Sequence, residues 1–166
     1  MLRRLFSVAY FLIVLVACVG VWMVSEPAMA AVDDYVVQFL KVDEPIALDL
    51  DKQGNTSQFS AEALSEGKQL FKQHCMSCHV GGTTLQDPTV SLSLEKLAGA
   101  TPPRDTINGL VAFLRQPMSY DGSEESYWCR KVTERWMPQA KIEKLAAFVL
   151  RAAQKAPGWG VNTFEL

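Results

Sequence analysis

The stretch that decides the fold is Cys75-Met76-Ser77-Cys78-His79. Two cysteines three residues apart lie on the same side of a helical turn, so each sulfur can add to a vinyl group on one edge of a porphyrin. The histidine that follows can then ligate the iron through its imidazole. The pattern predicts one covalently attached haem c, bound through Cys75 and Cys78, with His79 as an axial ligand.

The same cysteine spacing also occurs in redox pairs and in zinc sites. A zinc site would need a second cysteine pair or a histidine cluster, and the whole chain contains only four cysteines and two histidines. The haem is therefore the preferred interpretation of the motif.

The first thirty residues are typical of a secretory signal. Two arginines lie near the start, residues 8–24 are apolar, and a small-x-small cleavage site ends at Ala30. We expect residues 1–30 to be removed as a signal peptide. An uncut leader acting as a membrane anchor and a lipoprotein signal ending at Cys18 are the alternatives.

Charge and cysteine number limit the function further. The chain of 166 residues suits one domain, and its formal net charge of −2 argues against a nucleic-acid partner. Exported proteins usually pair their cysteines, yet only Cys75, Cys78 and Cys129 would remain after cleavage. Once the haem takes two of them, Cys129 is left without a partner.

Together with the haem motif, hydrophobic patterning predicts an all-α, single-domain c-type cytochrome with three to five helices around one covalent haem. Short alternations and a Gln-Gly-Asn-Thr break within residues 31–59 indicate an N-terminal extended arm or hairpin. Residues 60–166 would form the cytochrome domain. Long loops in so small a domain imply that a cofactor fills part of the core.

Three longer helices follow from apolar residues at helical spacing. Ser60 offers an N-cap for a helix that leads into the haem motif, and Asp105 can cap a second helix that ends before Pro117. A third helix is expected after Pro138. Gly67 suits a class in which the first and last helices cross closely.

The second face of the iron needs its own ligand. The only other histidine, His74, lies five residues before His79 on the same segment, so it cannot reach the opposite face of the ring. The remaining donors in the mature chain are Cys129, Met118 and Met137.

Two of these donors are preferred on sequence grounds. Cys129 stands beside Arg130 and Lys131, whose positive charges would favour the thiolate. A thiolate would stabilise ferric iron and lower the reduction potential. Met137 directly precedes Pro138, an arrangement similar to the methionine ligand position of small soluble cytochromes c. Cys129 is narrowly ahead, with Met137 as the alternative.

Several further stretches match one known family: Glu66-Gly67-Lys68, Leu70-Phe71, Val80-Gly81-Gly82, Ala100-Thr101-Pro102-Pro103-Arg104-Asp105, Gly109-Leu110-Val111 and Tyr120-Asp121-Gly122. Over residues 60–122 the chain resembles the low-potential extrinsic cytochrome c of photosystem II, the cytochrome c-550 family. The Ala-Thr-Pro-Pro-Arg-Asp segment is much more specific than the haem motif, which all c-type families share.

The resemblance implies a mostly helical fold around one haem, a location in the thylakoid lumen, and binding at the lumenal face of photosystem II. That family has a histidine as second axial ligand shortly after Tyr-Asp-Gly, whereas this chain has Trp128, Cys129 and Arg130 there. With one residue deleted, Cys129 falls on the histidine's place. The resemblance therefore favours Cys129 and indicates a diverged relative or duplicate of the usual subunit.

The expected function is one-electron transfer, or a haem-bearing accessory role, at low potential and without enzymatic activity. The partner would be the lumenal face of photosystem II or a soluble redox protein, with peripheral association on the lumenal side of the thylakoid membrane; the periplasm is the alternative location. A structural subunit without redox turnover and a haem-based gas or redox sensor are the competing functions. For a sensor, Arg130 is the only obvious distal group.

Overall fold

The computed structural model describes residue 14, residues 31–85 and residues 90–161. The predicted signal peptide, residues 1–30, therefore lies outside the described residues except for position 14. Within the described ranges, no helix combines the length and apolar character needed to cross a membrane.

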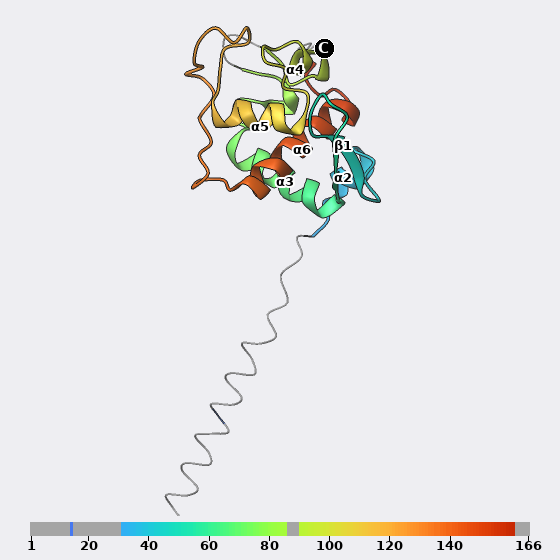
Figure 1. Ribbon diagram of the computed structural model, residues 1–166. Helices are drawn as coiled ribbons and strands as arrows, with labels where there is room; N and C mark the ends of the chain where they lie inside the picture. Colours follow the sequence, from blue (N-terminus) through green and yellow to red (C-terminus); the bar gives the residue numbers. More distant parts are fainter. Residues whose placement is uncertain (1–13, 15–30, 86–89, 162–166) are drawn as a thin grey trace, which may run out of the picture.

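The described residues form a helix-dominated body with one small sheet (Figure 1). The elements are α2 (Asp34–Gln38), β1 (Ile46–Asp49), β2 (Thr56–Phe59), α3 (Ala61–His74), the 3-10 turn η1 (Val80–Gly82), α4 (Leu94–Ala98), α5 (Ile107–Arg115) and α6 (Gln139–Lys155). These ranges contain five α-helices, so the prediction of a helical domain with three to five helices is confirmed.

The N-terminal segment contains the hairpin that the sequence predicted. Strands β1 and β2 pair antiparallel, and their buried residues Leu48 and Phe59 face the core. The short helix α2 was not predicted. It is tied to α3, because the backbone N–H of Asp33 donates to Ser65 Oγ at 2.9 Å and the Asp33 carboxylate pairs with Lys68 Nζ at 2.6 Å. The segment thus extends the core instead of standing apart from it.

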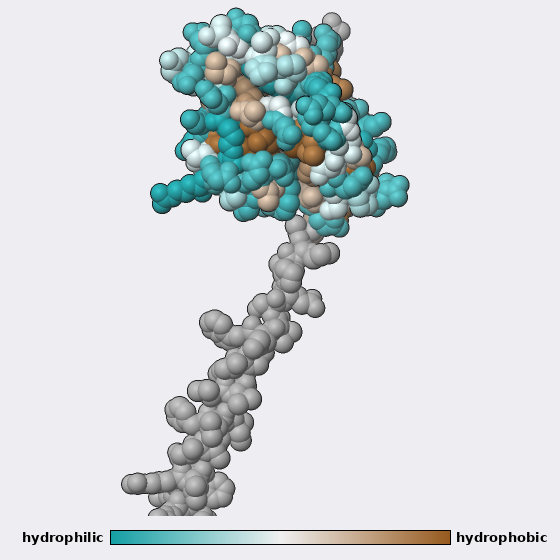
Figure 2. Space-filling model, viewed as in Figure 1, coloured by the Kyte–Doolittle hydropathy of each residue, from teal (hydrophilic) through white to brown (hydrophobic). Residues whose placement is uncertain are grey.

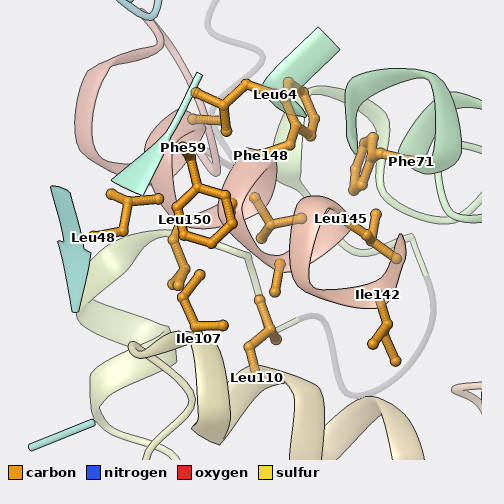
Figure 3. Close-up of a cluster of buried hydrophobic side chains, with 14 of the residues drawn as sticks. Leu48, Phe59, Leu64, Phe71, Ile107, Leu110, Ile142, Leu145, Phe148 and Leu150 are labelled. Carbon is orange, nitrogen blue, oxygen red and sulfur yellow. The ribbon is translucent and has the colours of Figure 1, made fainter. Parts of the chain in front are cut away.

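Helix α6 runs through the centre of the core, with apolar side chains from α3, α5 and the hairpin around it (Figure 3). It crosses α3 at Gly67, where an added Cβ would lie 2.0 Å from the Lys144 carbonyl oxygen and 2.9 Å from Phe148 Cβ. Only a residue without a side chain fits there. The close crossing expected at Gly67 is therefore confirmed.

The sequence predicted the N-cap residue of α3 correctly but not that of α5. Ser60 Oγ accepts the Ala63 N–H at 3.3 Å and caps α3 as predicted. Helix α5 is capped by Thr106, whose Oγ1 accepts the Gly109 N–H at 3.1 Å. The predicted cap, Asp105, instead pairs with Lys52. The assignment was wrong by one residue because a long-range ion pair takes the carboxylate.

Replacing Gly67 by alanine is predicted to lower the free energy of unfolding by about 1–3 kcal/mol, because the new methyl overlaps the α6 backbone. Gln69→Ala, on the exposed side of the same helix, is the matched control and should change it by less than about 0.5 kcal/mol. Urea denaturation of the haem-loaded protein measures both. Equal stability of the two variants would show that the helices do not cross at this glycine.

Candidate haem site

A cavity of ≈ 280 Å³ opens beside the α3–α6 crossing. Its lining comes from Phe71 to His79 at the end of α3, from residues 90–104, from α5, from the loop 118–129 and from α6. Figure 2 shows apolar surface in the middle of the body between hydrophilic margins. The cavity therefore offers an apolar interior whose walls are drawn from most of the helices.

The cavity brings four of the predicted site residues together: Cys75, Cys78, His79 and Cys129 all line it. None of the cysteines forms a disulfide among the described residues. Cys129 also raises the pKa of Cys75, so the two sulfurs lie near each other although they are far apart in sequence.

The two methionine candidates differ in position. Met118 lines the cavity, whereas Met137 is not among the described lining residues and is 2% exposed in the core. The Met137 carbonyl accepts a hydrogen bond from Arg115 Nη1 at 2.9 Å, which ties this residue to α5. The structure thus places Cys129, and not Met137, at the cavity wall.

The imidazole of His79 is held in one tautomer. Its Nδ1 lies 3.1 Å from the Thr83 carbonyl oxygen and 3.1 Å from Thr84 Oγ1. The Thr84 hydroxyl donates to the Val90 carbonyl, and a carbonyl can only accept, so the proton belongs on Nδ1. Burial lowers the pKa of His79, against a smaller opposing effect of the Thr83 hydrogen bond. The ring is therefore neutral, with Nε2 free to ligate a metal.

Burial also shifts the pKa values of two of the cysteine thiols. It raises the pKa of the Cys75 thiol to about 12, with Cys129 and Cys78 adding to the effect. Burial raises the pKa of Cys129 as well, and the Arg104 guanidinium opposes that rise. Thiols in this apolar environment stay protonated until a vinyl group or a metal ion takes the sulfur.

The cation near Cys129 is not the one that the sequence suggested. Neither Arg130 nor Lys131 is among the charges that shift the pKa of Cys129, and the Arg130 guanidinium lies 4.4 Å from the ring centre of Trp136. Arg104 supplies the positive charge from a distant part of the chain. Sequence proximity was therefore a poor guide here, and the only signal for Arg104 was its place in the Thr-Pro-Pro-Arg-Asp segment.

His74 lies outside the site. Its side chain is exposed and packs edge-on against Trp136, with ring centroids 5.2 Å apart. The sequence-based exclusion of His74 as the second ligand agrees with this position, since His74 is not among the residues that line the cavity.

These features fit a haem. The walls include Phe71, Leu97, Leu110, Leu145 and Val149, which suit the apolar faces of a porphyrin. Two cysteines and a neutral imidazole from a Cys-x-x-Cys-His motif lie at one side of the same cavity. A small helical domain with such a cavity is a c-type cytochrome.

Comparisons with known proteins refine this class. The model of the cytochrome c-550 domain matches residues 37–166. A cytochrome c-550-like protein of Trichodesmium erythraeum is 53% identical, covering 98% of each chain. The PsbV2 cytochrome from Thermosynechococcus elongatus, known from a crystal structure, is 59% identical in sequence to this chain, and the two structures superpose with a TM-score of 0.77. The match covers 79% of this chain and 100% of that one.

A third relative carries a different name. The photosystem II extrinsic protein V of Gloeobacter violaceus is 50% identical over 85% of this chain and 76% of its own length. This chain belongs to the cytochrome c-550 family, and its cofactor is covalently bound haem c.

Proposed function

We propose that this protein is a low-potential, one-electron carrier whose single haem is attached through Cys75 and Cys78 and ligated by His79 and Cys129. The observation that carries the proposal is the meeting of all four side chains at one apolar cavity. When bound, the haem supplies one iron that alternates between ferric and ferrous. The protein holds both ligands and limits the access of water.

The position of the donors supports the ligand pair. His79 offers Nε2, because its Nδ1 proton is engaged by Thr83 and Thr84. Cys129 lines the same cavity from the loop 118–129, while Met137 is fixed in the core through Arg115. A thiolate stabilises ferric iron by its charge, so this pair implies a low reduction potential. No substrate chemistry is needed for such a role.

The family and the leader sequence support a proposal for the location and the partner. One relative is named photosystem II extrinsic protein V, and the first thirty residues of this chain have the pattern of an export signal. We place the mature protein on the lumenal side of the thylakoid membrane, associated with photosystem II or with a soluble redox protein. A mildly acidic net charge suits a peripheral, salt-sensitive contact.

Covalent attachment is tested by Cys75→Ser/Cys78→Ser, with Cys129→Ser as the matched cysteine control. We expect the double variant to lose all haem staining on a denaturing gel, because neither thioether can form. Cys129→Ser should keep the staining of the unmodified protein, since an axial ligand is not a covalent attachment. Staining lost in the control, or kept in the double variant, contradicts the assignment.

The second ligand is tested by electron paramagnetic resonance and absorption spectra of the ferric protein. We predict a low-spin thiolate signature that disappears in Cys129→Ser and persists in Met137→Leu. Met118→Leu is a further control, because Met118 also lines the cavity. A methionine-to-iron band that survives in Cys129→Ser would move the ligand to a methionine and indicate an ordinary soluble carrier.

Location is tested by separating thylakoid membranes from the cells that make this protein. We expect the mature chain on the lumenal side, protected from added protease until the membranes are broken, and released from them by concentrated salt. Release without salt would favour a soluble partner over photosystem II. Digestion by protease in intact thylakoids would contradict a lumenal location.

A further inference from the structure

Trp159 lies in the turn that follows α6 and packs back onto the core. Its ring centre is 5.4 Å from that of Phe71 on α3 and 5.8 Å from that of Phe148 on α6, and Figure 3 labels both phenylalanines. The indole Nε1 donates to the Leu92 carbonyl oxygen at 3.0 Å. Aromatic contacts with two helices and one directional hydrogen bond therefore fix the position of this side chain.

The same turn binds two other segments of the chain. A Cβ added at Gly82 would lie 2.5 Å from the Trp159 ring, so the indole covers this glycine directly. Gly160 donates its backbone N–H to the Gly81 carbonyl at 2.8 Å, and Leu92 donates its own to the Gly82 carbonyl at 2.7 Å. These five residues form one bonded unit, which we call the Trp159 clamp.

The Trp159 clamp adjoins the hydrogen-bond acceptor of His79. Thr83 directly follows Gly82, and its carbonyl oxygen lies 3.1 Å from His79 Nδ1. The Gly82 N–H also donates to the His79 carbonyl at 3.2 Å. A displacement of Gly82 would therefore change the contact between the imidazole and the carbonyl that accepts its proton. Such a contact sets the ring orientation and the basicity of a ligating histidine.

We propose that Trp159 is a positioning residue for the haem ligand His79, because it holds the Thr83 carbonyl within hydrogen-bond reach of His79 Nδ1. The proposal rests on the assignment of His79 as an iron ligand and does not depend on the ligand opposite. Trp159 is not among the described residues that line the cavity. It therefore acts through the turn at Gly82 and not by contact with the haem.

Hydrogen exchange of the His79 Nδ1 proton tests this role in the haem-loaded protein. Isotope-labelled histidine isolates the signal, because the chain contains two histidines and His74 is exposed. Trp159→Phe keeps an aromatic ring but removes the indole donor. It should speed this exchange about tenfold relative to the Leu145 N–H in the core of α6. Trp136→Phe, a matched change of a tryptophan outside the cavity, should change the ratio by less than about threefold.

The ratio to the Leu145 proton separates positioning from general stability. If Trp159 only stabilises the fold, Trp159→Phe should speed both protons equally, and an unchanged ratio would overturn the proposal. A proton on His79 Nε2 in the unmodified, haem-loaded protein would show that His79 does not bind iron. That result would remove the ligand assignment itself, and the proposal with it.

A pair of glycines provides a second comparison if Trp159→Phe does not retain haem. Gly81 and Gly82 have positive φ angles of 58° and 79°, so alanine strains the backbone at both. The methyl of Gly82→Ala meets the indole ring, whereas that of Gly81→Ala meets open space. Gly82→Ala should therefore speed exchange of the His79 proton, relative to Leu145, about tenfold more than Gly81→Ala. Equal exchange in the two variants would contradict the proposal.

Discussion

The contact of α3 with α6 at Gly67 is the constraint on which the rest of the structure depends. Because the two backbones meet there without an intervening side chain, the end of α3 is fixed against the central helix of the core. The haem motif follows directly after α3, and Leu145 and Val149 of α6 form part of the cavity wall. One close helix crossing thus fixes both the attachment motif and the apolar face opposite it.

The other half of the site depends on long-range contacts. The loop 118–129 reaches the cavity after α5, and Arg104 binds two carbonyls at its start. The same guanidinium acts on Cys129 at the end of that loop. A single buried side chain therefore anchors the start of this loop.

Local patterns in the sequence predicted a large part of this arrangement. The Ser60 cap, the helix after Pro138, the hairpin and the crossing at Gly67 depend on neighbours within a few residues or on the absence of a side chain, and all agree with the structure.

Features set by distant contacts were missed. Asp105 lost its capping role to an ion pair with Lys52, and the cation near Cys129 was assigned to Arg130 and Lys131 instead of Arg104. In both cases the fold, and not the local sequence, decides which charges meet. The cavity that contains Cys129 and excludes Met137 from its described lining depends on the path of an irregular loop, which no periodicity encodes.

The most direct test of the account is a crystal structure of the ferric, haem-loaded protein. The account predicts iron bound between His79 Nε2 and Cys129 Sγ, with thioether links to Cys75 and Cys78. A methionine sulfur or an open position opposite His79, with Cys129 turned away from the iron, would contradict it.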